Sequence, residues 1–338
     1  MTDLRKDPLL DHWVIMAANR SQRPGAFIES PPFEPGLPCP FCAGHEDETP
    51  PEVLAFRGAG GKADGLHWRV RVVPNKFSAI DSGGDAQPLD AGIYQGLDAC
   101  GAHEVILETP RHVASTADLS VAELSEVLLA YQMRLAYWKR DPRMAYGQIF
   151  KNVGQAAGAS LEHAHSQLLV IPQVPHVIAA EMAAARDYFR RRGCCPFCDM
   201  IRAELADGRR IVEETACHLS FAPYAARLPF ETWILPKGHA SCYEETPREQ
   251  LEDLAGIMRS VIRRLEAAVG RCAYNYILHT TPFGTSTSDA GAPDNYHWHI
   301  EIVPAMIKTA GFELGTGWFI NPVAPEDSAQ RMRGILPG

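Results

Sequence analysis

Two segments of the chain carry apolar residues at the spacing of an amphipathic helix. These residues are Leu124, Val127, Leu128, Tyr131 and Leu135 in the first segment, and Leu251, Leu254, Met258, Val261 and Leu265 in the second. Residues 120–123 and 246–249 precede them, and both have the sequence of a capping box, the second with Pro247 at the first helical position. The pattern predicts one helix that begins after Ser120 and another that begins after Thr246.

Short apolar runs broken by Gly and Pro predict strands on both sides of each helix. The runs are residues 104–112, 146–150 and 163–172 in the first part of the chain, and residues 231–239, 274–278 and 297–304 in the second. Each part has one such helix among several strands, and strands do not alternate with many helices. This arrangement favours a largely antiparallel sheet with the helices packed on one side.

The same order of motifs occurs twice along the chain. Cys39 to Cys42 and Cys195 to Cys198 both read Cys-Pro-Phe-Cys, and each pair is followed by a histidine, a helix, a strand and a His-x-His segment that ends in Pro. The agreement of helix start, strand and terminal Pro indicates duplication of one α+β unit. We therefore predict two domains, residues 1–180 and 181–338, with a helical connection at residues 173–193.

Charge and composition limit the functions of this chain. Its 338 residues carry a net charge of -9, and 46% of them are hydrophobic, which is enough apolar material for a large core. An acidic chain lacks the excess of Lys and Arg that nucleic-acid binding needs, so nucleic acid is not an expected partner. The N-terminal residues have no apolar signal-peptide core, and no apolar run approaches the roughly 20 residues of a membrane span. We therefore expect a cytoplasmic protein without a membrane partner.

The nine cysteines are odd in number and include two Cys-x-x-Cys pairs, which favours metal chemistry over a disulfide framework. The first set of predicted zinc ligands is Cys39, Cys42, His112 and His163, and the second set is Cys195, Cys198, His239 and His297. His279 competes for a place in the second set. The alternatives are free buried cysteines or redox-active pairs, but a redox role lacks a thioredoxin-like context. Because neither set implies an open coordination position, we expect two structural Zn2+ ions per chain.

Successive side chains alternate between the two faces of a strand, so His163, His165 and Gln167 share one face. His163 can then bind zinc while His165 points into a substrate cleft. A neutral imidazole is a good nucleophile toward phosphorus near pH 7, and Gln167 can donate an amide N–H to a phosphoryl oxygen. We predict that His165 attacks the α-phosphorus of a nucleotide sugar and releases a sugar 1-phosphate. The alternatives for His165 are a second metal ligand or a buried core histidine.

Two further segments bear on this prediction. Residues 152–160 are rich in small side chains, which lets backbone N–H groups approach a phosphate closely. In the second copy, His299 takes the place of His165, but Glu301 stands where the first copy has Gln167, and the preceding loop differs. We therefore expect one catalytic centre, in the first copy.

The sequence resembles the galactose-1-phosphate uridylyltransferase family of the histidine-triad superfamily along nearly its whole length. The resemblance is carried by residues 20–24, 73–77, 152–167 and 311–317, in which the His-x-His-x-Gln segment and its upstream Gly-x-Ser are quite specific. It implies an α+β fold in which a duplicated histidine-triad-like unit forms a half-barrel of antiparallel strands, with helices packed outside. It also implies a homodimer, and ping-pong transfer through a covalent nucleotidyl-histidine between a nucleotide sugar and a sugar 1-phosphate.

The resemblance also implies roles for individual residues. It assigns His165 as the nucleophile and Gln167 as its phosphate partner, and it places Phe41 near the base. Four residues fall where the family contacts nucleotide or phosphate: Asn75, Asn152, Gly158 and Ser160. Phe312 and Glu313 lie in a segment similar to the cross-subunit sugar-binding region. The zinc ligands that it implies are the two sets given above.

The chain departs from the uridylyltransferases next to His165. Ala164 stands where those enzymes have Pro, and Ser166 where they have Gly, and this version is similar to plant ADP-glucose phosphorylases. The leading prediction is uridylyl transfer between UDP-glucose and galactose 1-phosphate. The alternative is an ADP-glucose phosphorylase or adenylyltransferase with inorganic phosphate as the acceptor. A zinc-stabilised nucleotide-binding protein without chemistry is the alternative of a different class.

Overall fold

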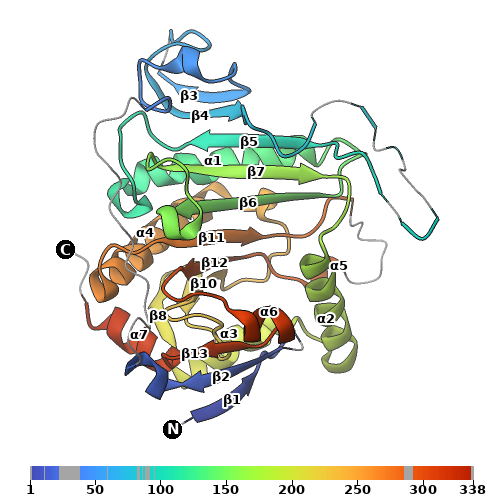
Figure 1. Ribbon diagram of the computed structural model, residues 1–338, viewed down its shortest axis with the longest axis vertical. Helices are drawn as coiled ribbons and strands as arrows, with labels where there is room; N and C mark the ends of the chain where they lie inside the picture. Colours follow the sequence, from blue (N-terminus) through green and yellow to red (C-terminus); the bar gives the residue numbers. More distant parts are fainter. Residues whose placement is uncertain are drawn as a thin grey trace.

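The computed structural model describes residues 2–10, 12–22, 39–58, 60–81, 84–85, 87, 92–94, 96–284 and 292–335, so residues 23 and 24 of the family segment 20–24 lie outside it. Within these ranges the largest element is an open antiparallel sheet of ten strands (Figure 1). Its strands, in spatial order, are β3 (Leu54–Arg57), β4 (Trp68–Pro74), β5 (Ala102–Leu107), β7 (His165–Ile171), β6 (Tyr146–Val153), β11 (Tyr274–His279), β12 (His299–Pro304), β10 (Thr232–Pro236), β9 (His218–Phe221) and β8 (Ile211–Glu214).

The order of the strands repeats on either side of the β6–β11 pair. From β6 outward it is β7, β5, β4 and β3, and from β11 outward it is β12, β10, β9 and β8. The strands that follow the two His-x-His motifs, β7 and β12, therefore hold equivalent places in the two halves of the sheet. The prediction of an α+β fold, with an antiparallel sheet that forms part of a barrel and does not close, is confirmed.

Helices α1 (Val121–Trp138) and α4 (Arg248–Val269) cover one face of this sheet and lie behind the strands in Figure 1. Their buried residues, such as Leu128 and Met258, form one core cluster with strand residues from both halves, such as Ile149 and Tyr276. Because strand side chains alternate between faces, the residues next to these on each strand point to the opposite face. The core thus unites the two halves on the helical side.

The opposite face of the sheet differs between the halves. In the second half, α2 (His176–Arg192) and α3 (Pro196–Asp207) contribute Ala185 and Phe197 to an apolar cluster with Trp233 of β10. In the first half the same face carries a smaller cluster that includes Val105, with Phe41 packed against it. The predicted helical connection at residues 173–193 corresponds to α2, and the predicted domain boundary at 180 and 181 falls within this helix.

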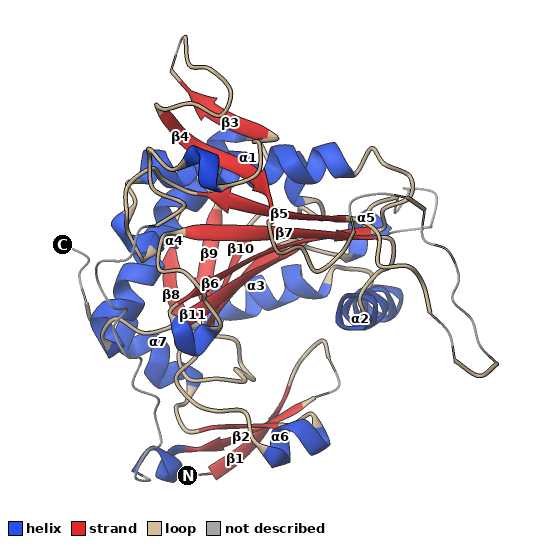
Figure 2. Ribbon diagram, turned by 45° about the horizontal axis from the view of Figure 1, so that its top comes forward, coloured by secondary structure: helices blue, strands red, loops and turns tan. Residues whose placement is uncertain are grey.

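A second, three-stranded sheet lies apart from the large one, at the bottom of Figure 2. It consists of β1 (Thr2–Lys6), β2 (Trp13–Ala17) and β13 (Phe319–Asn321). Arg5 of β1 forms an ion pair with Glu326 of α7 (3.0 Å), so the start of the chain lies beside its C-terminal part. The other helices in the described ranges are α5 (Ala292–Asn295), α6 (Gly311–Thr316), α7 (Pro325–Arg333), η1 (Ala18–Gln22), η2 (Glu46–Glu48), η3 (Thr116–Asp118), η4 (Gln155–Ala157) and η5 (Tyr243–Glu245).

All nine cysteines lie among the described residues, and none of them forms a disulfide. This agrees with the expectation that they do not form a disulfide framework. The described helices include none that is long and apolar enough to cross a membrane.

The two predicted capping boxes have different outcomes. At α1 the box is present: the Glu123 N–H donates to Ser120 Oγ (3.2 Å), and the Ser120 N–H donates to Glu123 Oε2 (2.8 Å). At α4 the prediction was wrong, because the helix begins at Arg248 with Pro247 as its N-cap and has no side-chain cap. The reason is that Thr246 already ends η5, where its N–H donates to the Tyr243 carbonyl oxygen (3.0 Å).

This difference predicts effects of different size for two similar substitutions. Ser120→Ala removes a helix cap and should lower the free energy of unfolding by about 1 kcal/mol. Thr246→Val should change it by less than about 0.5 kcal/mol, because the buried Thr246 hydroxyl has no hydrogen-bond partner to lose. Urea unfolding followed by circular dichroism measures both values. A larger loss for Thr246→Val than for Ser120→Ala would contradict the assignment of the caps.

Candidate functional site

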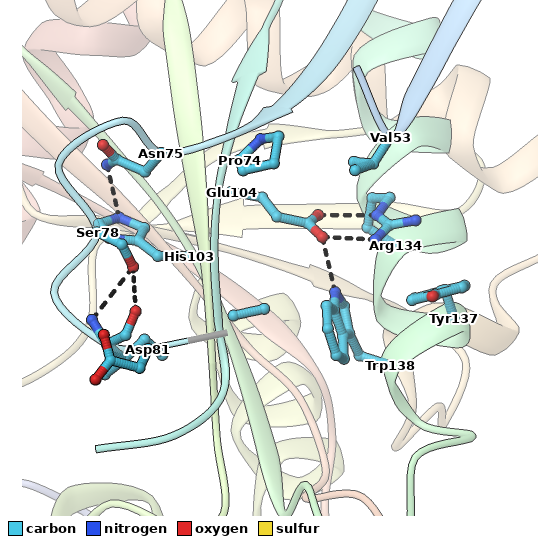
Figure 3. Close-up of a pocket in the computed structure, with 12 residues that line it drawn as sticks. Val53, Pro74, Asn75, Ser78, Asp81, His103, Glu104, Arg134, Tyr137 and Trp138 are labelled. Atoms are coloured by element: carbon cyan, nitrogen blue, oxygen red, sulfur yellow. Dashed lines mark hydrogen bonds and ion pairs between the residues drawn. The ribbon is translucent and has the colours of Figure 1, made fainter. Parts of the chain in front are cut away.

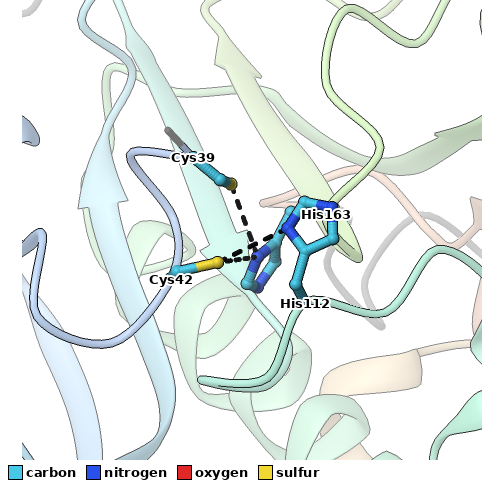
Figure 4. Close-up of side chains that lie close together, drawn as sticks. All are labelled: Cys39, Cys42, His112 and His163. Atoms are coloured by element: carbon cyan, nitrogen blue, oxygen red, sulfur yellow. Dashed lines mark hydrogen bonds between the residues drawn. The ribbon is translucent and has the colours of Figure 1, made fainter. Parts of the chain in front are cut away.

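Cys39, Cys42, His112 and His163 come from three separate segments and meet in one cluster (Figure 4). The cysteines precede η2, His112 follows β5, and His163 lies just before β7. Cys42 Sγ lies 3.4 Å from His112 Nδ1, and both sulfur atoms lie 3.6 Å from His163 Nδ1. The predicted first ligand set is thus assembled in space, and its donor atoms converge on one point where a metal ion can be held.

The other nitrogen of His163 determines which ring atom faces the sulfur atoms. His163 Nε2–H donates to the carbonyl oxygen of Thr109 (2.8 Å), so Nδ1 carries the lone pair. Burial is the main cause that lowers the pKa of His163 to about 4, which keeps the ring neutral. A neutral imidazole whose second nitrogen donates to a backbone carbonyl is the usual arrangement of a metal-bound histidine.

The second ligand set has the same arrangement. Cys195, Cys198, His239 and His297 form a cluster of convergent donor atoms. Cys198 Sγ lies 3.4 Å from His239 Nδ1 and 3.7 Å from His297 Nδ1, and His297 Nε2–H donates to the carbonyl oxygen of Pro236 (2.8 Å). His279 does not compete for this cluster, because its Nδ1 bonds to Glu181 Oε2 (2.9 Å), beside His299.

His165 is the first residue of β7 and belongs to neither ligand cluster. Its Nδ1–H donates to the carbonyl oxygen of His163 (2.7 Å), so the lone pair lies on Nε2. His165 is 7% exposed, and Phe41 packs against its ring with ring centroids 5.2 Å apart. Burial lowers the pKa of His165, and the nearby Lys151 ammonium group acts in the same direction. The side chain is therefore a neutral, oriented imidazole with a small accessible surface.

Gln167 lies two residues further along the same face, and a histidine on the neighbouring strand orients its amide. The Ala79 N–H donates to His103 Nδ1 (3.2 Å), so His103 Nε2 carries the proton and donates it to Gln167 Oε1 (2.8 Å). Because its oxygen accepts this bond, the NH2 group of Gln167 is left as a donor. Asn75 Nδ2 lies 3.1 Å from the same His103 nitrogen. Asn75 and His103 also line a pocket of about 560 Å³ at the start of β5 (Figure 3).

The segment after β6 forms a tight turn around two glycines. Gly154 and Gly158 have φ angles of 80° and 85°, which favour glycine. The N–H groups of Ala157 and Ala159 both donate to the Gly154 carbonyl oxygen (3.1 Å), and that of Gly158 donates to Gln155 (2.9 Å). These three N–H groups are therefore used within the turn, and the expected approach of backbone N–H groups to phosphate stays a prediction for the rest of the loop.

Asn152 and Ser160 flank this turn. The β6–β7 register pairs Phe150 with Gln167, so two residues further on Asn152 lies level with His165 on the same face. A Cβ added to Gly158 would lie 3.7 Å from Asn152 Nδ2, so the NH2 end of Asn152 lies near this glycine. Ser160 is exposed in the segment that leads to β7.

Phe312 and Glu313 do not join the first-half site within this chain. Both lie on α6, which packs with β13, beside the small sheet in Figures 1 and 2. Phe312 is 42% exposed, and Glu313 accepts a hydrogen bond from the Ala310 N–H (3.0 Å). In the view of Figure 1, β10, β12, β11 and β6 separate α6 from β7.

The second His-x-His strand is covered by protein side chains. His299 is 0% exposed, and its ring stacks on Trp233 with centroids 5.1 Å apart. Glu181 of α2 lies 3.6 Å from its Nε2. The position that corresponds to His165 is thus packed by side chains of the protein.

Sequence reasoning missed three features around His165. His103 lies one residue before the predicted strand. Alternation places it on the same face as Val105, but the pairing of Val105 with Gln167 follows only from the strand register. Lys151 and Glu108 form a buried ion pair on the helical side, and burial lowers the pKa of Lys151. Tyr131 donates to Ser166 Oγ there (2.6 Å), so Ser166 belongs to the same buried polar group. The available signal in the sequence was a charged residue, Lys151, at a strand position that faces the core.

Comparison with known families supports this duplicated arrangement. Residues 59–175 match the galactose-1-phosphate uridyl transferase N-terminal domain, and residues 181–318 match the C-terminal domain. The chain belongs to the galactose-1-phosphate uridyl transferase family. The two matched regions together cover most of the chain, and each contains one His-x-His strand.

Relatives within the family carry two different names. An ADP-glucose phosphorylase of Arabidopsis thaliana is 33% identical over 98% of this chain and 93% of its own length. A galactose-1-phosphate uridylyltransferase of Haemophilus influenzae is 28% identical over 98% of this chain and 93% of its own. The crystal structure of an ADP-glucose phosphorylase from Arabidopsis thaliana with bound ADP-glucose has a TM-score of 0.83 and 31% identity, and the alignment covers 100% of both chains. A uridylyltransferase structure has a TM-score of 0.76 and 27% identity, covering 99% and 98%.

Proposed function

We propose that this protein is a nucleotidyltransferase in which His165 attacks the α-phosphorus of a nucleotide sugar. One observation carries the proposal: His165 Nδ1–H is held by the His163 carbonyl oxygen at 2.7 Å, which leaves the Nε2 lone pair free on the face that also bears Gln167. An oriented neutral imidazole of this kind needs no separate base to attack phosphorus. The face that surrounds it supplies amide donors rather than acidic groups, which suits a negatively charged substrate.

The proposed nucleotidyl transfer has two steps. In the first, a bond forms between Nε2 and the α-phosphorus, and the bond from that phosphorus to the bridging oxygen breaks, releasing a sugar 1-phosphate. The ring then carries a substituent on Nε2 and a proton on Nδ1, so it is positively charged, and the His163 carbonyl oxygen stabilises that charge. In the second step a phosphate oxygen of the acceptor attacks the same phosphorus, and the bond to Nε2 breaks.

The residues around His165 have supporting roles in this proposal. The NH2 groups of Gln167 and Asn152 donate to the nonbridging oxygens of the α-phosphate, and Ser160 and Asn75 bind further along the nucleotide. Phe41 packs on His165 and contacts the base. Gly158 lets the chain pass close to the phosphate without a side chain.

For the substrates, we place ADP-glucose with inorganic phosphate first, and UDP-glucose with galactose 1-phosphate second. The order rests on the higher identity and TM-score of the ADP-glucose phosphorylase of Arabidopsis thaliana, compared with the uridylyltransferases. Ala164 and Ser166, which depart from the uridylyltransferase pattern, support the same order. Ser166 is also bonded to Tyr131 (2.6 Å), so a Gly at this position would remove a buried hydrogen bond.

The proposal predicts that the wild-type protein retains a nucleotide. Incubation with ADP-glucose should add AMP to the intact mass, and incubation with UDP-glucose tests UMP in the same way, while His165→Gly should add neither. Phosphate should discharge retained AMP as ADP, and galactose 1-phosphate should discharge retained UMP. The His299→Gly variant is the matched control, because it removes the equivalent side chain of the second copy, and it should still be labelled if it folds. Absence of both labels from the wild type would refute nucleotidyl transfer.

We propose that the two Cys/His clusters each hold a structural Zn2+ ion. Zinc bound tetrahedrally at about 2.3 Å to sulfur and about 2.0 Å to nitrogen separates those two ligand atoms by about 3.5 Å. The sulfur–nitrogen distances of 3.4 to 3.7 Å in both clusters match this separation. A bound ion would hold the loops of each cluster together, and in the first copy it would hold His163, whose carbonyl oxygen orients His165.

Metal analysis of the purified protein should therefore find about two zinc ions per chain. Cys39→Ser and Cys195→Ser should each remove about one of them and lower the unfolding temperature, because structural zinc contributes directly to folding. Only Cys39→Ser should also slow nucleotide labelling strongly, since it loosens His163. A wild-type protein with its full unfolding temperature but without zinc would contradict the assignment.

We propose a homodimer in which α6 of one subunit completes the sugar site of the other. The observation in support is that Phe312 and Glu313 lie beside the small sheet, away from β7 of their own chain.

A mixed dimer tests this arrangement. A heterodimer of one His165→Gly subunit and one Glu313→Ala subunit, purified with two different tags, contains one site with both residues intact. It should regain about half of the wild-type turnover, although each variant alone has almost none. An inactive heterodimer, or a monomeric wild type in light scattering, would contradict the shared site.

A further inference from the structure

Asn275 of β11 lies where the two halves of the large sheet meet. The antiparallel register pairs it with Asn152 of β6. Its NH2 group donates to Asn152 Oδ1 and to the carbonyl oxygen of Ala157, both at 2.8 Å. One side chain from the second half therefore binds both an amide and a turn that belong to the first half.

The first of these bonds determines how Asn152 is oriented. Because Asn152 Oδ1 accepts from Asn275, its NH2 group lies at the opposite end of the amide, near Gly158. Asn152 also lies level with His165 on the same face of the sheet. Without Asn275, the amide could turn over and present its oxygen, which repels a phosphate.

The second bond holds the glycine turn against β11. Ala157 ends η4, and its carbonyl oxygen is anchored by Asn275. At the other side of the turn, Gly154 packs so closely on Ala273 that an added Cβ would lie 2.8 Å from the Ala273 Cβ. Since the N–H groups of Ala157, Gly158 and Ala159 are used within the turn, the side-chain amide of Asn152 is a donor near Gly158 that this turn does not occupy.

We propose that Asn275 is a positioning residue for nucleotidyl transfer. It holds the NH2 group of Asn152 toward the α-phosphate and holds residues 154–158 beside it, without touching the substrate itself. The inference rests on the proposed function. It also assigns a task to the second half of the molecule, whose own His299 is covered.

Two substitutions test the proposal by the order of their effects. Asn275→Ala removes both donors and should lower the rate of nucleotide labelling at saturating donor about tenfold. Asn275→Asp keeps the shape but places a carboxylate against two carbonyl oxygens, so Asn152 turns its NH2 group away from the phosphate. Its rate should fall about a hundredfold, while the half-saturating donor concentration changes much less in both variants. A role in packing alone predicts the reverse order, with Ala worse than the isosteric Asp.

Gln148 provides a matched control on the same two strands. Its NH2 group donates to the carbonyl oxygens of Leu278 (2.8 Å) and Ile149 (2.9 Å), at the end of the β6–β11 pair away from His165. Gln148→Ala and Gln148→Glu should lower the unfolding temperature as much as the Asn275 variants do. Their labelling rates should stay within about twofold of the wild type.

The experiment is single-turnover labelling with ADP-glucose and UDP-glucose, followed by intact mass, together with thermal unfolding of every variant. A slower Asn275→Asp than Asn275→Ala, with unaffected Gln148 variants, supports the proposal. A labelled wild type whose Asn275 variants react within about twofold of it, or lose rate only in proportion to stability, overturns this inference and leaves the proposed function standing. An unlabelled wild type overturns both.

Discussion

The hydrogen bond from His165 Nδ1 to the His163 carbonyl oxygen, at 2.7 Å, is the interaction on which the proposed chemistry depends. His163 can serve as a fixed acceptor because its own ring is held on both sides, by the cysteine sulfur atoms and by the Thr109 carbonyl oxygen. A rotation of the backbone here would break one of these contacts. The Cys/His cluster and the proposed nucleophile are therefore coupled through two residues of one chain segment, so an ion held by this cluster would affect reactivity without contacting the substrate.

The amide donors Gln167 and Asn152 are also oriented by a hydrogen bond to one of their atoms. Gln167 and Asn152 each have their oxygen atom occupied, the first by His103 and the second by Asn275, so each has its NH2 group free. Both amides are carried by strands of a sheet whose neighbours are hydrogen-bonded on either side, and such elements hold side chains more precisely than loops do. The glycine turn, in which the N–H groups of Ala157, Gly158 and Ala159 bond within the turn, lies beside Asn152.

The two halves share an architecture but differ in what covers the His-x-His strand. Both histidines, His165 and His299, donate Nδ1–H to the carbonyl oxygen two residues earlier. In the second half, Trp233, Phe197 and Glu181 fill the space above the ring, and burial lowers the pKa of His299 to about 4. In the first half the smaller cluster around Phe41 leaves His165 slightly exposed. The two halves thus share one scaffold. The segments packed on that scaffold leave His165 slightly exposed and bury His299 completely.

The sequence by itself determined the repeated elements, the helix start at Ser120, the two groups of Cys and His that cluster in space, and the face shared by His163, His165 and Gln167. These features follow from local periodicity and from the chemistry of short motifs. The sequence wrongly predicted a cap at Thr246, because η5 already uses that residue's backbone. The tertiary structure alone decided that His103 orients Gln167, that Asn275 orients Asn152, and that α2 covers His299. His103 and Gln167 are 64 residues apart along the chain, and Asn275 and Asn152 are 123 residues apart. Contacts at such separations depend on strand order and register, which no local pattern encodes.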